Sequence, residues 1–121
     1  MKHTVSLKKK FQFRYVYNKG KSLANRHLVM YVVKTGKQMN HIGISVSKKV
    51  GKSVVCSRVT RLIRESYRLT EEQIAKGYDI VVIARVFANG ASFQEIDHSL
   101  KHLLKKHNLL LSNITKKEEC K

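Results

Sequence analysis

Acidic residues are scarce in this chain of 121 residues, which has 8 Asp and Glu against 25 Lys and Arg and a formal net charge of +17. No acidic residue precedes Glu65, whereas 16 of the basic residues do. Without paired carboxylates in the basic half, we do not expect the protein itself to hold the two metal ions of a nuclease site. A surface so poor in negative charge is typical of a protein that binds a polyanion.

Cysteine is rare and proline is absent. Cys56 and Cys120 lie far apart and form no C-x-x-C motif, so we expect neither a disulfide framework nor a zinc site. No internal repeat or low-complexity linker divides the chain, which predicts a single domain over residues 1–121 with an ordered core of about 7–110 and loose ends. The start, MKHTVSLKKK, lacks an apolar signal-peptide core, and no apolar run approaches the length of a membrane span, so we expect a cytoplasmic protein with no membrane partner.

Motifs for catalysis, nucleotide binding and metal binding are also missing. The chain has no P-loop and no G-x-G-x-x-G, and Cys56 has no evident partner base that would make it a nucleophile. Only His98 and His102 have the spacing of neighbours on a helix, and no H-E-x-x-H is present. We expect exposed helix histidines rather than a metal site, and no cofactor bound by the protein. The six histidines are His3, His27, His41, His98, His102 and His107.

The segment FQFRYVYNKG can be read in two ways. Its aromatic residues alternate, which indicates a strand. Phe13, Val16 and Tyr17 also have helical spacing, and the following Gly20 would end a helix. We favour the helix.

Three segments predict strands. His27–Val33 is a β-rich run that is apolar on both faces, and His41–Ser47 alternates between apolar and small residues. The short polar loop between these two runs predicts a hairpin. Tyr78–Val86 is a continuous apolar run, which is typical of a strand covered on both faces.

Two long segments predict helices. Val54–Arg68 has an apolar stripe at helical spacing. The sequence from Thr70 to Gln73 predicts a capping box and a short second helix that runs to Lys76. Ser92 and Glu95 predict another capping box, before a final helix with its own apolar stripe. The two stripes are Val55, Val59, Leu62, Ile63 and Ser66, and Ile96, Leu100, Leu103 and Leu104. The patterns alone thus predict the order α-β-β-α-β-α, a mixed α+β domain.

Four arginines follow one side of the first of these helices, at Arg58, Arg61, Arg64 and Arg68, with Glu65 as the one acidic residue among them. A solvated helix face would need acidic residues four positions away to balance this charge. We therefore favour phosphate binding, because the planar guanidinium grips phosphate oxygens with two hydrogen bonds.

Aromatic residues are interleaved with cations near the N-terminus. Phe13, Tyr15, Tyr17 and Tyr31 alternate with or lie close to Arg14, Lys19 and Lys21. For any one of these rings, packing in the core is the simpler interpretation. As a group beside cations, they also suit the stacking of unpaired RNA bases.

These segments resemble the protein subunit of bacterial ribonuclease P. ISVSKKVGKSVV followed by SRVTRLIRESYR is similar to that family's basic turn and arginine helix, and FRYVYNKGKSLANRHLVMYVV is similar to its first helix and strand. YDIVVIARV and the final amphipathic helix match its C-terminal part, so the resemblance covers about Leu7 to Leu110. The family's R-N-R and x-K-R read here Cys56-Ser57-Arg58 and Val59-Thr60-Arg61, so Cys56 and Thr60 stand where that family has cations.

The resemblance implies a fold and a function. The implied fold is a single α+β domain of order α-β-β-β-α-β-α, in which helices pack on a mixed sheet. It contains an uncommon left-handed β-α-β crossover and is similar to the second domain of a small-subunit ribosomal protein. The implied partner is a catalytic RNA that requires Mg²⁺ and removes the 5′ leader from precursor tRNA, while the protein itself is not catalytic. We also expect the free protein to bind anions such as sulfate or phosphate.

The same resemblance implies two sets of site residues. Those expected to contact the RNA subunit are Lys48, Lys49, Lys52, Ser57, Arg58, Arg61, Arg64 and Arg68. Those expected to contact the leader of precursor tRNA are Phe13, Tyr17, Asn25, Arg26 and Tyr31.

Another class of protein would explain part of this pattern. A ribosomal or general RNA-binding protein without a processing role accounts for the charge equally well, although not for an aromatic cleft. A free-standing nuclease has little support, because the basic half of the chain lacks carboxylates.

Overall fold

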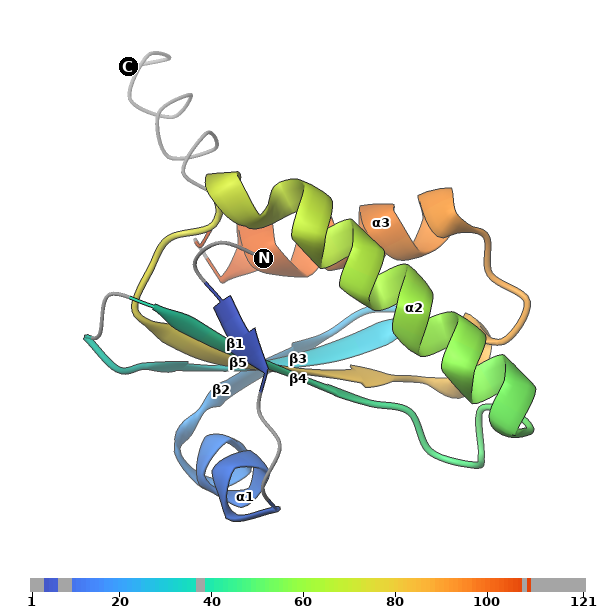
Figure 1. The fold of residues 1–121 in the computed structure, drawn as a ribbon, viewed down its shortest axis with the longest axis horizontal. Helices are drawn as coiled ribbons and strands as arrows, with labels where there is room; N and C mark the ends of the chain where they lie inside the picture. Colours follow the sequence, from blue (N-terminus) through green and yellow to red (C-terminus); the bar gives the residue numbers. More distant parts are fainter. Residues whose placement is uncertain (1–3, 7–9, 37–38, 108, 110–121) are drawn as a thin grey trace.

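A mixed sheet of five strands, in the order β1-β4-β5-β3-β2, forms the centre of the computed structural model. Helices α2 and α3 cover one face and α1 covers the other (Figure 1). The structure describes residues 4–6, 10–36, 39–107 and 109. The elements are β1 Thr4–Ser6, α1 Lys10–Lys19, β2 Lys21–Ala24, β3 Leu28–Lys34, β4 Asn40–Ser45, α2 Ser53–Thr70, β5 Tyr78–Ala84 and α3 Phe93–Lys106, with 3₁₀ turns η1 Glu71–Gln73 and η2 Val86–Ala88.

The strand pairing confirms the expected α+β class. β4 and β5 are parallel neighbours joined through α2, and β3 pairs antiparallel with both β5 and β2. With α2 above the sheet and β4 and β5 running from left to right, β5 lies behind β4 (Figure 1), so the crossover is left-handed. That hand is uncommon for such a connection.

Two apolar clusters hold the layers together. Strand β5 contributes to both, because Ile80 and Val82 pack towards α2 and α3 while Val81 packs towards α1. On α2, Val59 and Ile63 are fully buried and Val55 and Leu62 are partly buried. This burial confirms the predicted apolar stripe and leaves the opposite side of the helix in solvent. Each fully buried aliphatic side chain contributes about 1.5–3 kcal/mol.

The predicted hairpin between the runs at His27–Val33 and His41–Ser47 is wrong. β3 and β4 are not neighbours, because β5 lies between them and pairs with each. A strand that is apolar on both faces is most stable at the centre of a sheet. The run Tyr78–Val86, which predicted a strand covered on both faces, therefore separates β3 from β4.

The short elements differ from the patterns in other ways. Strand β2, which the family resemblance implied and the patterns missed, is exposed along its whole length. Thr4–Ser6, within the N-terminal end that was expected to be loose, pairs with β4 as strand β1. The second helix expected after Thr70 is only the 3₁₀ turn η1, and the Thr70 hydroxyl donates to the Ser66 carbonyl instead of capping a helix. The capping box of Ser92 and Glu95 is confirmed.

Candidate nucleic-acid interface

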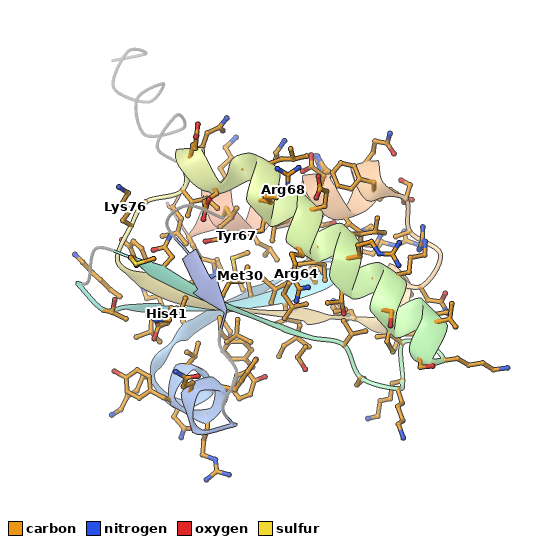
Figure 2. The ribbon with its side chains drawn as sticks, viewed as in Figure 1. Met30, His41, Arg64, Tyr67, Arg68 and Lys76 are labelled. Atoms are coloured by element: carbon orange, nitrogen blue, oxygen red, sulfur yellow. The ribbon has the colours of Figure 1, made fainter. Side chains whose placement is uncertain are left out.

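Of the four arginines predicted to bind phosphate, two lie unpaired on the exposed side of α2, among the residues that the structure describes. Arg61 and Arg64 are exposed and make no ion pair with any residue that the structure describes. Together with Cys56, Ser57 and Thr60 they line a hollow of about 400 Å³. Figure 2 shows Arg64 and Arg68 on the same helix as the buried Tyr67. Unpaired guanidinium groups beside a concave surface can receive phosphate oxygens without first breaking an internal ion pair.

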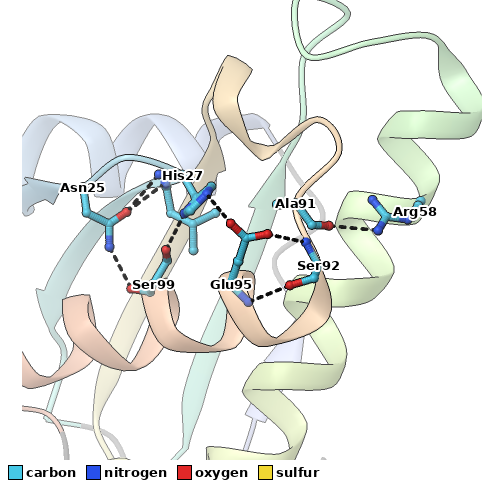
Figure 3. Close-up of polar contacts among 8 residues, drawn as sticks. Asn25, His27, Arg58, Ala91, Ser92, Glu95 and Ser99 are labelled. Carbon is cyan, nitrogen blue, oxygen red and sulfur yellow. Dashed lines mark hydrogen bonds and ion pairs between the residues drawn. The ribbon is translucent and has the colours of Figure 1, made fainter.

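The other two arginines are already engaged. Arg68 forms an ion pair and hydrogen bonds with Glu65, which raise the pKa of Arg68 and lower that of Glu65. The Arg58 Nη2 donates to the Ala91 carbonyl at 2.8 Å, so Arg58 links α2 to the loop before α3 (Figure 3). The arginine row that looked uniform in the sequence therefore divides into two free members and two with internal partners.

Lysines surround the beginning of α2. Lys48, Lys49 and Lys52 are all exposed, and Lys48 and Lys52 line a hollow of about 720 Å³. The first turn of α2 contains no acidic residue, and Lys52 at the N-cap makes no side-chain hydrogen bond to the free N–H groups of that turn. The positive end of the helix dipole thus adds to the charge of the lysines.

Cys56 connects the two hollows because it lines both of them. Its thiol donates to the carbonyls of Ser47 and Gly51, at 3.4 and 3.3 Å. The Thr60 hydroxyl donates to the Cys56 carbonyl at 2.8 Å. Cys56 and Thr60, the two positions at which this chain lacks the cations of the family pattern, therefore hold side chains that bond to the protein's own backbone. Cations at this end of the helix come instead from the preceding turn.

The aromatic residues form a cleft between α1 and the sheet. The rings of Phe13 and Tyr17 lie 6.4 Å apart, and Tyr17 meets Tyr31 edge to face at 5.1 Å. Phe13 and Tyr17, with Arg14, Ile44 and Ser45, line a hollow of about 400 Å³.

Both interpretations of these rings hold in part. Phe13 and Tyr31 pack against the small core under α1, while Tyr17 remains 37% exposed. Burial and the neighbouring Tyr31 raise the pKa of Tyr17, and a hydrogen bond with Ser45 opposes that shift. Tyr15, which the sequence grouped with them, is exposed and does not line the hollow.

Asn25 and Arg26 do not join this cleft. The Asn25 amide nitrogen donates to the Ser99 carbonyl at 2.9 Å, and its oxygen accepts from the backbone N–H of Leu28 at 3.0 Å (Figure 3). Asn25 thus ties the β2–β3 turn to α3, on the face of the sheet opposite α1. The Arg26 guanidinium lies 5.5 Å from the ring centre of Phe87. The family resemblance grouped these two residues with the aromatic ones as leader contacts, and in the structure they lie apart from the aromatic hollow.

The remaining titratable side chains make structural contacts. His27 Nδ1 lies 2.7 Å from the Ser99 hydroxyl, and His41 Nδ1 lies 3.0 Å from Asp79. The rings of His98 and His102 stack 6.4 Å apart. Among the described residues, no three side chains of metal-binding type come together. No described helix is long and apolar enough to cross a membrane.

Several residues that shape these surfaces have no recognisable signal in the sequence. Ile44 and Ser45 line the aromatic hollow because β4 runs beside α1, which depends on the strand order. Gly51 permits the turn to approach α2, since a Cβ there would lie 2.8 Å from the Cβ of Val55. Phe87, more than half exposed beside two arginines, was not singled out either.

Comparisons with known proteins agree on one family. Residues 1–108 match the family model described as Ribonuclease P. The ribonuclease P protein component of Alkaliphilus oremlandii is 49% identical, over 94% of this chain and 100% of the relative. That of Clostridium acetobutylicum is 54% identical, over 90% and 96%. Among solved structures, a Staphylococcus aureus RNase P protein mutant with defective mRNA degradation activity has a TM-score of 0.81 at 37% identity, covering 87% of this chain and 89% of the other. The Thermotoga maritima RNase P protein has a TM-score of 0.77 at 32% identity, covering 84% and 96%.

Proposed function

Because the chain belongs to the ribonuclease P protein family, we propose that it binds a catalytic RNA through α2 and the leader of precursor tRNA through the cleft beside α1. In this proposal the protein assists the endonucleolytic removal of the 5′ leader, and the RNA holds the Mg²⁺ ions and performs the hydrolysis. The observation that carries the proposal is the pair of different surfaces on one small domain. One presents unpaired arginines and lysines, and the other presents aromatic rings.

The surface of α2 has the chemistry to bind the backbone of a folded RNA. Arg61 and Arg64 lie in one hollow, and the adjoining hollow presents Lys48 and Lys52. Contacts of this kind neutralise phosphates and release counterions, whatever the base sequence. The lysines around Cys56 support a shift of RNA contact from the helix itself towards the preceding turn.

The cleft beside α1 has the chemistry to bind unpaired nucleotides. Tyr17 is partly exposed above a concave surface, and Arg14 lies at the same hollow. An aromatic face accepts any base by stacking, while a neighbouring cation attracts the phosphate. A leader must be held without regard to its sequence in many precursors, and stacking meets that need.

The acidic side chains of the domain support assigning hydrolysis to the RNA. Glu65 pairs with Arg68, Asp79 lies 3.0 Å from His41, and Asp97 accepts from Ser66 and pairs with Lys101. Glu95 completes the capping box of α3. Each of these carboxylates has a structural partner, whereas metal-dependent hydrolysis by the protein would need carboxylates gathered around a metal ion.

Reconstitution with a bacterial ribonuclease P RNA tests the proposal. At low Mg²⁺ concentration, adding the protein should accelerate cleavage of precursor tRNA at the leader junction. The assembled particle should also bind precursor tRNA more tightly than mature tRNA, because the cleft contacts the leader. Equal affinity for both would favour a general RNA-binding protein instead. Cleavage by the purified protein alone would contradict the assignment of hydrolysis to the RNA.

We also propose that anions stabilise the free protein at the start of α2. Lys48, Lys49 and Lys52 repel one another there, beside the uncompensated positive end of the helix dipole. An anion that binds the folded state raises its stability by mass action. Sulfate or pyrophosphate should therefore raise the melting temperature by more than chloride at the same ionic strength, and equal effects would contradict this part of the proposal.

A further inference from the structure

Two histidine rings lie parallel on α3, which covers the face of the sheet opposite α1 (Figure 1). The ring planes of His98 and His102 differ by 4°, and their centres are 6.4 Å apart. His102 is partly buried, whereas His98 is exposed and makes no hydrogen bond or ion pair in the part of the chain that the structure describes. We call these two residues the histidine pair.

Asn25 fixes the orientation of the His102 ring. The Asn25 side-chain oxygen accepts from the backbone N–H groups of His27 and Leu28, at 3.2 and 3.0 Å, so the other end of this amide is its nitrogen. That nitrogen lies 3.4 Å from His102 Nδ1 and donates a hydrogen bond to it. With Nδ1 as the acceptor, the ring proton of His102 lies on Nε2.

The gap between the two rings nearly matches the thickness of a nucleic-acid base. Four residues advance an α-helix by about 6.0 Å and turn it by about 40°. Rings that stay parallel through this turn lie roughly across the helix axis, so most of the 6.4 Å separates the two ring faces. A base between two rings needs about 7 Å, which is twice the optimal distance between stacked carbon atoms. A small rotation of the exposed His98 side chain supplies the difference.

Free cations lie beside the histidine pair. Residues three and four positions apart are neighbours on a helix surface, so Lys105 and Lys106 lie beside His102. Both lysines are exposed and form no ion pair with a described residue, whereas Lys101 pairs with Asp97 at 3.0 Å. Parallel rings next to free cations have the chemistry to hold an unpaired base and to attract the phosphates on either side of it.

The histidine pair is separate from both RNA-binding surfaces of the proposed function. Asp97 of α3 accepts from Ser66 of α2, whereas His102 meets Asn25 of the β2–β3 turn, so the pair lies on the side of α3 that turns away from α2. The aromatic cleft lies on the other face of the sheet, beside α1. RNA bound at the histidine pair is therefore a different segment from the RNA bound at either surface.

We propose that the histidine pair binds one unpaired RNA base between its two rings. This inference goes beyond the proposed function, although it rests on the protein working in a complex with RNA. The base stacks on both imidazole rings, and Lys105 and Lys106 contact the flanking phosphates. A loop or bulge of the RNA subunit and an unpaired base of precursor tRNA offer the same chemistry, and the experiment distinguishes these two sources.

A purely structural role makes a different prediction. If the pair served only the fold, His102→Ala would lower the melting temperature, because it removes the contact with Asn25. His98→Ala would then change neither stability nor RNA binding, because His98 is exposed and has no polar partner among the described residues. A base-binding pair needs both rings, so His98→Ala should weaken RNA binding while the melting temperature stays the same.

The experiment measures two affinities of the full chain. The first is for a bacterial ribonuclease P RNA, and the second is that of the particle for precursor tRNA, at protein concentrations that saturate the RNA subunit. His98→Ala should weaken one of the two by about 5- to 100-fold, the value of one stacked base. A loss in the first affinity assigns the base to the RNA subunit. A loss in the second alone assigns it to precursor tRNA, and this loss should be the same with and without the leader.

Two control variants make the result specific. His98→Phe keeps an aromatic ring and should keep both affinities. Gln94→Ala changes another exposed side chain, one turn earlier on α3, and should also leave both affinities unchanged. If His98→Ala changes neither affinity, or if His98→Phe loses as much as His98→Ala, the inference is overturned while the proposed function stands. If the unchanged protein does not accelerate cleavage, the proposed function fails instead, whatever His98→Ala does.

Discussion

Replacing Arg61 and Arg64 together by alanine should weaken binding of the RNA subunit and flatten its dependence on salt. Both guanidiniums are exposed, unpaired within the described residues and at the same hollow. Each phosphate contact contributes about 0.7 to 0.9 to the slope of log affinity against log salt concentration. Loss of both contacts should therefore reduce the slope by about 1.4 to 1.8. Substitution of an exposed side chain that has no internal partner typically changes stability by about 0.5 kcal/mol or less, so the fold should persist.

The two engaged arginines provide matched controls. Arg68 is held by Glu65, and RNA must compete with that ion pair, so Arg68→Ala should change the slope less than Arg61→Ala. Arg58→Ala removes the hydrogen bond to the Ala91 carbonyl and should lower stability by about 1.5–3 kcal/mol. A replacement that keeps charge, Arg61→Lys, should preserve the slope but lose affinity, because lysine cannot form two parallel hydrogen bonds to one phosphate.

The assay is equilibrium binding of the labelled RNA subunit over a range of monovalent salt concentrations at fixed Mg²⁺. An unchanged slope in the double variant would show that Arg61 and Arg64 are merely solvated. Equal slope changes for Arg61→Ala and Arg68→Ala would refute the reasoning that internal pairing decides which arginines bind RNA.

Three further predictions concern the scaffold. Ser92→Ala removes the cap of α3 and should lower the free energy of unfolding by about 1 kcal/mol, measured by urea titration. Ile63→Ala opens a cavity under α2 and should cost about 2–5 kcal/mol in the same titration, and a smaller loss would show that the core collapses around it. Burial lowers the pKa of His107, so the unfolded chain binds a proton at this residue more readily than the folded protein does. The contribution of His107 to the free energy of unfolding is therefore fully present above its ordinary pKa of 6.5 and is lost as pH falls through the lower pKa of the folded state. His107→Gln should therefore flatten the stability curve just below pH 6.5, and an unchanged curve would contradict this.

Periodicity in the sequence predicted α2 and α3 because the side chains that a helix buries against a sheet recur at a fixed spacing along the chain. Val59 and Ile63 face the core as the stripe required, and the capping box of Ser92 formed as its residues indicated. The order of the strands could not be predicted in this way. The hairpin prediction failed because a short loop shows only that two strands are near in sequence, not that they pair. β5 takes the position between them because it is buried on both faces.

The site was predictable in composition but not in detail. Positive charge and aromatic residues indicated an RNA-binding protein, since these properties depend on residue type alone. Which arginine remains free depends on distant contacts, such as that of Arg58 with Ala91. Asn25 and Arg26 are neighbours of the aromatic segment in sequence, but Asn25 bonds to Ser99, which lies 74 positions away.

The topology explains why charge gathers at one end of this small domain. β4 and β5 are parallel, so their carboxyl ends point the same way, and the β2–β3 turn meets them because β3 runs antiparallel. The N-terminus of α2 begins at that same end, since the helix must return along the sheet. Cations from these four segments therefore converge, while Asp79 lies near the start of β5, at the opposite end. Because the charges come from segments distant in sequence, only the folded domain presents them together, and RNA binding and folding should stabilise each other.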